Sequence, residues 1–339
     1  MYRLPKSSLN AFFAAIANTA KLYLPADKDG QAYYTEWKED VQFSDKLNTL
    51  RSAKDFFFPQ TQNLADFKIN GKLIEVIDNR KESEDFVLFG VRACDAASFD
   101  ILDKVFLSEP VDTYYKTRRE HGVVITLACN KPEETCFCSA FGLDASTPGG
   151  DISCWMDSDC LYLDAKTEKG SALINKLGGI IEECDNSSAD AVKAEIKNIL
   201  NVLPLSELKP ADLTDKLLDT FKSEKWAELS QSCLGCGSCT FVCPTCQCYD
   251  IKDFDTGCGI KRIRTWDSCM YSDFTKMAHG NPRISQMERF RQRFMHKLVY
   301  FPQNNEGVYG CVGCGRCLRQ CPISMNIVKV MKTLGGEQK

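Results

Sequence analysis

The chain has 339 residues, a formal net charge of −4, and 44% hydrophobic and 26% charged residues. These values are typical of a globular protein with two domains, and they exclude a largely disordered or a collagen-like chain. No apolar run reaches the roughly 20 residues that are needed to cross a bilayer, so we expect no role in a membrane.

The start of the chain has the pattern of a mixed α/β domain. Residues 9–20 could imitate a signal peptide, but two asparagines interrupt the apolar run and no twin-arginine signal is present. We therefore predict a first helix there and a cytoplasmic protein. The segments 72–77 and 86–91 are rich in Val, Ile, Leu and Phe and are predicted to be strands.

The next segments indicate a parallel unit. Helices are predicted at 95–106 and 110–120, followed by a buried strand at 123–128. A strand, a helical crossover and a second strand together favour a parallel pair. Further along, we predict a weak strand at 161–163 and helices at 187–203 and 211–231.

A basic stretch lies in the second part of the chain. Residues 257–300 hold nine Lys and Arg against three Asp and Glu, whereas the rest of the chain has a net charge of −10. Such a stretch can dock an acidic redox partner or bind nucleic acid. The simplest interpretation is the solvated face of a helix near 285–300, and we expect no nucleic-acid partner.

Cysteine content is the strongest compositional signal, with 19 cysteines beside three histidines. An odd number cannot pair completely in disulfides, and a chain of this length can fold around a core without them. Thiolates for soft metals explain the count better. With so few histidines, all-Cys sites must dominate, which leaves iron–sulfur clusters or Cys-only zinc.

Two copies of one motif favour iron–sulfur clusters. The spacing C-x2-C-x2-C-x3-C-P occurs at 233–244 and again at 311–322, and it is the bacterial ferredoxin ligand run for [4Fe–4S] clusters, in which the fourth Cys ligates the other cluster. Zinc sites usually have longer gaps between paired cysteines, so they are the weaker alternative. We predict one cluster on Cys233, Cys236, Cys239 and Cys321, and a second on Cys311, Cys314, Cys317 and Cys243.

A third group of cysteines follows the predicted parallel strands. Cys94 comes after the strand at 86–91, Cys129 comes after the strand at 123–128, and Cys136 and Cys138 follow in the next loop. Ligands gather at the carboxyl ends of parallel strands, so these thiols are candidates for a third [4Fe–4S] cluster, with Asp95 as an alternative oxygen ligand. The alternative is a set of buried free thiols.

The remaining cysteines give weaker signals. Cys246, Cys248 and Cys269 could extend or tune a cluster site, although buried thiols beside the second motif are the simpler interpretation. Cys154, Cys160, Cys184 and Cys258 are isolated and are expected to be ordinary thiols. No Gly-rich phosphate-binding motif is present, so we expect no flavin or nicotinamide site in this chain.

These pieces resemble a known family, which comprises the iron–sulfur electron-transfer subunit of anaerobic sulfite reductase and the beta subunit of sulfhydrogenase-type nickel–iron hydrogenases. The resemblance rests on FGVRACDAASFDILDKVFL (89–107), DTYYKTRREH (112–121), TCFCSAFG (135–142), CLGCGSCTFVCPTCQCYD (233–250), RTWDSCM (264–270), ERFRQRFMHK (288–297) and CVGCGRCLRQCP (311–322). It implies an α/β domain before a dicluster ferredoxin domain. It also covers the third cysteine group and Cys246, Cys248 and Cys269.

The resemblance implies a relay function. The expected partners are a ferredoxin–NADP-reductase-like subunit with FAD and a [2Fe–2S] cluster, and a catalytic sulfite reductase or hydrogenase subunit. We predict an α+β protein in which a mixed α/β domain, residues 1–210, precedes a helical two-cluster [4Fe–4S] ferredoxin-type domain, residues 211–339.

The sulfite reductase context is favoured slightly, and the hydrogenase context is the alternative. We expect no catalysis by this chain alone. A substrate-binding iron–sulfur enzyme, with its site at the third cysteine group, is the alternative of another class.

Overall fold

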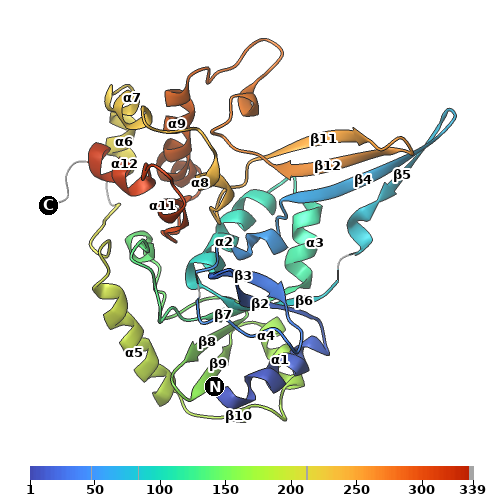
Figure 1. The fold of residues 1–339 in the computed structure, drawn as a ribbon, viewed down its shortest axis with the longest axis vertical. Coiled ribbons are helices and arrows are strands. Elements are labelled where there is room, and N and C mark those ends of the chain that lie inside the picture. Colours follow the sequence, from blue (N-terminus) through green and yellow to red (C-terminus); the bar gives the residue numbers. More distant parts are fainter. Residues whose placement is uncertain (47, 83, 211–212, 336–339) are drawn as a thin grey trace.

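The computed structural model describes residues 1–339 except 47, 83, 211–212 and 336–339, and places them in a body with a projecting arm (Figure 1). An eight-stranded sheet forms the centre of the body, in the order β10-β1-β9-β8-β7-β6-β2-β3. Its strands are β1 (Tyr2–Pro5), β2 (Lys21–Lys28), β3 (Gln31–Glu36), β6 (Phe86–Val91), β7 (Gly122–Leu127), β8 (Ile152–Met156), β9 (Cys160–Ala165) and β10 (Glu182–Glu183). The neighbours β2, β6, β7 and β8 run parallel. The predicted parallel pair, now β6 and β7, is therefore confirmed.

Helices cover both faces of this sheet, which explains why all six residues of β6 are buried. Helices α1 (Leu9–Ala17) and α4 (Glu168–Lys176) pack on one face, where Phe89 and Ile125 lie. Helices α2 (Ala93–Phe106) and α3 (Thr113–His121) pack on the other face, against Leu88 and Val124. Helix α5 (Ser187–Asn201) packs beside Trp155 of β8. Most of the predicted elements of this half are present within a few residues of their predicted bounds.

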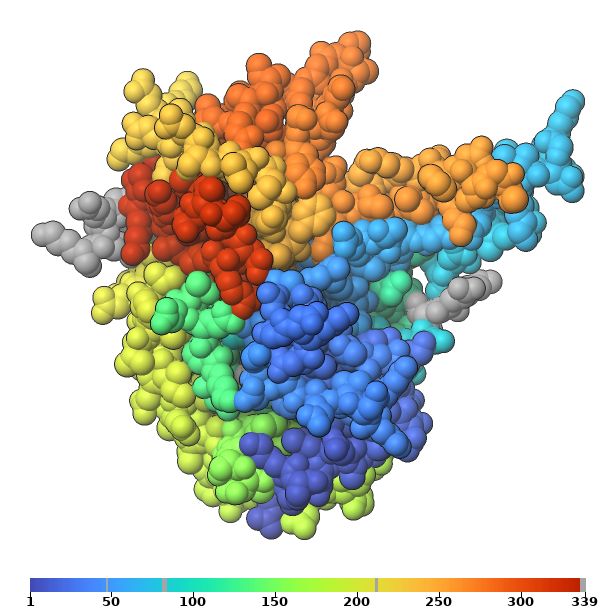
Figure 2. All heavy atoms as spheres, in the orientation of Figure 1, coloured from blue at the N-terminus to red at the C-terminus, as the bar shows by residue number. Residues whose placement is uncertain are grey.

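The arm is a second, antiparallel sheet in the order β11-β12-β4-β5. Its strands are β4 (Thr61–Asn70), β5 (Leu73–Asp78), β11 (Tyr249–Asp255) and β12 (Ile260–Trp266). Figure 2 shows that its outer end stands clear of the body, and Ile69, Ile74 and Val76 near that end are more than half exposed. Because β11 and β12 lie in the part predicted to be helical, that part is not helical throughout. Pairing of β12 with β4 joins the two parts of the chain in one sheet.

The base of the arm is anchored in the core. Trp266 stacks on Phe58 with ring centroids 5.9 Å apart, and its indole N–H donates to the Phe58 carbonyl oxygen at 3.1 Å. Arg264 is buried beside it and forms an ion pair with Asp112. Aromatic packing and a buried ion pair therefore fix where the arm leaves the body.

The rest of the chain is mainly helical. Its helices are α6 (Leu213–Asp219), α7 (Lys225–Ser230), α8 (Ser238–Phe241), α9 (Gln286–Met295), α10 (Phe301–Asn304), α11 (Arg316–Arg319) and α12 (Ile327–Leu334), with a π-helical turn at His296–Tyr300. Short 3-10 turns occupy Lys6–Ser8, Ala53–Phe56, Asn79–Glu82, Cys138–Phe141 and Asp273–Thr275. These helices pack around a core that includes Trp226, Phe290, Phe294 and Met331.

The single helix predicted at 211–231 is wrong in part. Residues 211–212 lie outside the described residues, α6 ends at Asp219, and α7 begins at Lys225. The break has a packing reason, because the Trp226 indole N–H donates to the Thr220 carbonyl oxygen at 3.0 Å. This turn brings both Leu217 and Trp226 into the same core.

Candidate metal centre

The two cysteine motifs share one backbone form. Gly235, Gly237, Gly313 and Gly315 all have positive φ, between 60° and 76°. Gly237 directly precedes α8, and Gly315 directly precedes α11. Residues with a Cβ disfavour this region of backbone conformation, so the glycines allow each loop to turn around a metal group. The repeated spacing in the sequence therefore corresponds to a repeated loop in the structure.

Four predicted ligands surround one internal cavity. The cavity is lined by Cys243, Cys311, Cys314 and Cys317 together with residues that include Phe137, Val312 and Ile327. Burial raises the pKa of Cys311 to about 12, so a metal group must displace the thiol proton when it binds. The structure thus brings together the four cysteines predicted for the second cluster.

The donor set fits an iron–sulfur cluster better than a single ion. Zinc sites usually have longer gaps between paired cysteines, whereas these four thiols have the ferredoxin-type spacing and border a largely apolar space. Four thiols around such a space are the donor set of a [4Fe–4S] cluster.

The first motif forms another group of thiols, the first group, whereas the four thiols around the cavity are the second group. The pKa of Cys239 is raised mainly by burial, and the nearby charges of Cys233 and Cys236 also contribute. Cys236 is exposed. Cys321 borders the same hydrophobic core as Cys233, and its sulfur accepts from the Met325 backbone N–H at 3.2 Å. Among the described contacts, none joins Cys321 to the other three, so the structure brings together three of the four cysteines predicted for the first cluster.

The third group lies at the places in the fold that the strand topology predicts. Cys94 lies in the first turn of α2, Cys129 follows β7, and Cys136 and Cys138 lie in the next loop, and all four are buried. Burial raises the pKa of Cys138 to about 12, with smaller contributions from Cys129 and Cys136. The thiols of Cys129, Cys136 and Cys138 therefore lie near one another after β7, and Cys94 packs in the same buried core as Cys129 and Cys138.

A buried arginine lies within this third group. Nη2 of Arg92 is 2.9 Å from Cys129 Sγ and 4.0 Å from Cys136 Sγ. The side chain is 1% exposed, and Nε and Nη1 have no hydrogen-bond partner in the described part of the chain. A buried cation without an anion is costly, so the site fits a group with negative charge. Sequence reasoning missed Arg92, although its position two residues before Cys94 was a signal for it.

The third group adjoins the cavity of the second motif. The Phe137 backbone N–H donates to the Gly313 carbonyl oxygen at 2.8 Å. A Cβ on Gly313 would lie 2.3 Å from the Phe137 oxygen, and one on Gly315 would lie 2.5 Å from the Thr135 oxygen. These two glycines therefore permit the close approach of the loop that carries Cys136.

A buried ion pair fastens the same junction. Nη1 and Nη2 of Arg316 each lie 2.6 Å from a carboxylate oxygen of Asp95, and both side chains are fully buried. Asp95 was considered an alternative metal ligand, but its carboxylate is engaged by Arg316. Its role in the structure is to hold α2 against the second cysteine loop.

Cys246, Cys248 and Cys269 lie near Lys297, which lines the cavity. The pKa of the Cys248 thiol is lowered to about 7, and its hydrogen bond with Cys269 is the main cause. Cys246 forms a similar pair with Cys243, and this pairing raises the pKa of Cys246. The structure therefore places Cys246 against Cys243, a predicted ligand of the second cluster, and pairs Cys248 with Cys269.

The prediction of a solvated helix face near 285–300 is wrong for two residues. Arg293 of α9 and Lys297 are 3% and 5% exposed and both line the cavity. Arg264 is also buried, against Asp112. Three of the nine Lys and Arg of 257–300 are therefore buried, and the other six are partly or fully exposed.

The isolated cysteines lie in unrelated places. Cys154 is fully buried in β8, Cys160 lies in β9, Cys184 follows β10, and Cys258 is exposed in the turn between β11 and β12. They remain ordinary thiols by prediction.

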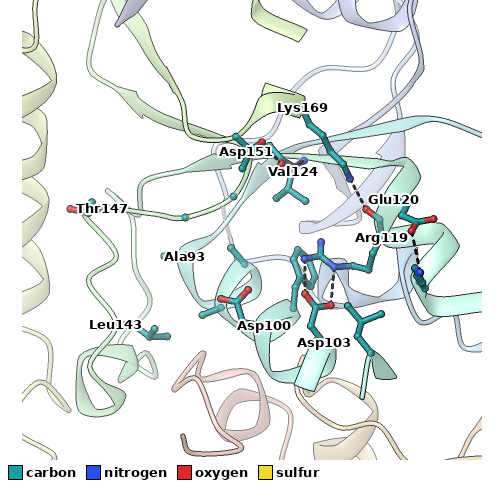
Figure 3. A pocket seen from close by; sticks show the side chains of 18 of the residues that line it. Ala93, Asp100, Asp103, Arg119, Glu120, Val124, Leu143, Thr147, Asp151 and Lys169 are labelled. Carbon is teal, nitrogen blue, oxygen red and sulfur yellow. Dashed lines mark hydrogen bonds and ion pairs between the residues drawn. The ribbon is translucent and has the colours of Figure 1, made fainter. Parts of the chain in front are cut away.

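A broad cleft opens beside Ala93 and Leu143, close in sequence to the third cysteine group (Figure 3). Two of its charged side chains form an ion pair, and a third donates a hydrogen bond to the backbone. Asp103 and Arg119 pair at 2.8 Å, and Lys169 Nζ donates to the Arg119 carbonyl oxygen at 2.8 Å. We therefore assign no catalytic group to this cleft. No helix among the described residues is long and apolar enough to span a membrane.

Comparison with known proteins gives two matches. A family model described as a 4Fe-4S dicluster domain matches residues 232–325, which contain both cysteine motifs. The chain is 32% identical to the sulfhydrogenase 2 subunit beta of Pyrococcus furiosus over 323 residues, which is 94% of each chain. No match was found among solved structures. The chain therefore belongs to the family of sulfhydrogenase-type beta subunits.

Proposed function

We propose that this chain is an iron–sulfur electron-transfer subunit of a sulfhydrogenase-type complex. It would take electrons from a subunit with FAD and a [2Fe–2S] cluster that oxidises NAD(P)H, and pass them to a nickel–iron catalytic subunit. The name of the Pyrococcus furiosus relative, a subunit of a larger enzyme, supports an assembly of several subunits.

One observation carries the proposal: the first thiol group adjoins the second, and the second adjoins the third. Cys239 of the first group lies near Cys243 of the second, and the second group meets the third at the Phe137–Gly313 contact. Bound clusters would supply one-electron transfer, and this arrangement of their ligands would let electrons pass from one site to the next.

The residues would hold three clusters. We propose [4Fe–4S] clusters on Cys233, Cys236, Cys239 and Cys321; on Cys243, Cys311, Cys314 and Cys317; and on Cys94, Cys129, Cys136 and Cys138. The unpaired charge of Arg92 supports the third site. The chain itself provides insulation, because Phe137, Val312 and Ile327 exclude water from the cavity.

We also propose a division of labour between residues 1–210 and 211–339. The first part would dock one partner and the second part the other, in the cytoplasm. Cross-linking that placed both partners on the same part would contradict this division.

The relative favours the hydrogenase context over the sulfite reductase context, which the sequence alone placed slightly first. The two contexts differ in the catalytic subunit that copurifies. We expect a nickel-containing subunit rather than a sirohaem protein. The sirohaem protein in its place would move this chain to the sulfite reductase branch of the family.

The experiment that tests the function is reduction of the chain within its native complex. Anaerobic addition of NADPH should bleach the iron–sulfur absorbance of this subunit, and addition of an oxidised acceptor to the catalytic subunit should restore it. Absorbance that does not respond to either would contradict a relay. A spectrum of the isolated chain that changes with sulfite would instead favour a substrate-binding enzyme.

A further inference from the structure

Three cations are buried beside the cysteines of the second part of the chain. Lys54, Arg293 and Lys297 are between 2% and 5% exposed. Across the described residues, no ion pair joins any of them to a carboxylate. Burial of an unpaired charge is costly, so an anion is expected beside them.

Lys297 faces the cavity of the second motif. Its Nζ donates to the Thr245 hydroxyl at 2.7 Å and to the Gly310 carbonyl oxygen at 2.9 Å, and both acceptors are neutral. The groups around it that can carry negative charge are the thiols of Cys243, Cys246 and Cys311. The charge of Lys297 is therefore directed at the cysteines and has no carboxylate to neutralise it.

Arg293 lies between the first and the second thiol groups. Its Nη2 donates to the Cys239 carbonyl oxygen at 3.5 Å, and its Nε has no partner among the described residues. Its charge acts on Cys239 of the first group and on Cys317 of the second. One side chain thus faces two predicted cluster sites.

Lys54 completes the set from the other part of the chain. Its Nζ donates to the Cys246 carbonyl oxygen at 2.8 Å and lies over the Trp266 ring, 3.9 Å from the centroid. Lys54 is not among the residues that line the cavity, whereas Lys297 and Arg293 border it directly.

Other buried arginines show what is missing here. Arg316 is as deeply buried as Arg293, but it has the carboxylate of Asp95 at 2.6 Å. Arg264 likewise has Asp112. The two buried cations that line the cavity, Arg293 and Lys297, therefore lack the carboxylate partner that Arg316 and Arg264 have.

We propose that the positive charges of Lys297 and Arg293 neutralise part of the negative charge of a cluster in this cavity and so raise its reduction potential. The inference rests on the proposed function. Reduction adds one negative charge, and a cation in a site of low dielectric stabilises the reduced state more than the oxidised state. Lys297 acts on the second cluster, whereas Arg293 acts on both ferredoxin-type clusters.

The test is a redox titration of the full chain, purified anaerobically and monitored by EPR. Lys297→Met keeps the length of the side chain and removes the charge. It should lower the equilibrium constant for reduction of one cluster at least tenfold, which is about 59 mV for one electron. Lys297→Arg should restore most of the shift. Arg293→Met should lower the potentials of two clusters.

Arg291, on the same helix as Arg293, provides a matched control. Arg291 stacks on Phe221 at 3.8 Å and donates to the Phe221 carbonyl oxygen, away from the thiols. Arg291→Met should leave all potentials unchanged. An unchanged potential in Lys297→Met with full iron content would overturn the proposal.

Loss of about four iron atoms in Lys297→Met, with retention in Lys297→Arg, would support it, because only the charge is then required. Loss in both variants would overturn it and would mean that packing alone matters. If the chain without any substitution contains no iron, the proposed function itself is refuted.

Discussion

The two thiol groups that meet at the Phe137–Gly313 contact are built in different ways. Three ligands of the second group come from one loop, 311–317, whose glycines set its turns. The third group gathers Cys94, Cys129 and the loop with Cys136 and Cys138 from the ends of separate elements. The first kind of site depends on local backbone geometry, and the second kind depends on the whole sheet being formed.

This difference also appears in the charges. The cavity of the second group has Lys297 and Arg293 on its wall, while the third group has Arg92 alone. In both places a buried cation lacks a carboxylate partner within the described chain. The common feature of the two sites is therefore the unpaired positive charge, and not the spacing of the cysteines.

The largest effect is expected from Cys314→Ser. The change removes one of four thiols from the cavity, so we expect loss of the second cluster, about four fewer iron atoms per chain and no electron flow through the complex. Cys184→Ser is the matched control, since Cys184 lies apart from the three groups, and it should keep both iron content and electron flow. Equal losses in the two variants would show that ligands and bystanders are wrongly assigned.

The next largest effect is expected from Cys129→Ser. It should remove the third cluster, again about four iron atoms, and leave the EPR signals of the two ferredoxin-type clusters in place. Iron analysis combined with EPR of the reduced protein measures both. If iron content does not change, Cys129 is a buried thiol and the third site is not a cluster.

Asp95→Asn should lower stability without removing a ligand. It leaves the guanidinium of Arg316 buried without its carboxylate, which costs about 3–5 kcal/mol. Denaturant unfolding of the protein with its clusters in place measures the loss. Asp190→Asn, which breaks an exposed pair with Lys193, is the control and should change stability little. Similar small losses in both would mean that the buried pair does not fasten the junction.

The smallest effect is expected from Gly313→Ala. The new Cβ would lie 2.3 Å from the Phe137 carbonyl oxygen at a φ of +60°, so the two loops must separate, at a cost of about 1–3 kcal/mol. Gly142→Ala also has positive φ, but its Cβ meets nothing within 4 Å, so it tests the backbone strain alone. Thermal unfolding should be lower for Gly313→Ala than for Gly142→Ala. The reverse order would argue against a tight junction.

The sequence predicted what depends on local pattern. Strands β6 and β7 follow from continuous apolar runs, and the paired cysteine loops follow from their spacing and glycines. It did not predict the arm, because pairing of β12 with β4 joins residues about 200 positions apart. The buried ends of Arg293, Lys297 and Arg316 were missed for a related reason: charge in a sequence does not indicate whether a side chain points into the protein.

The measurement that tests the central claim most directly is iron and acid-labile sulfide per chain, on protein purified without oxygen. Three clusters predict about twelve of each, with EPR signals from all three in the reduced state. About eight of each would contradict the third site and leave residues 1–210 as a docking region. Zinc in place of iron would contradict the relay as a whole.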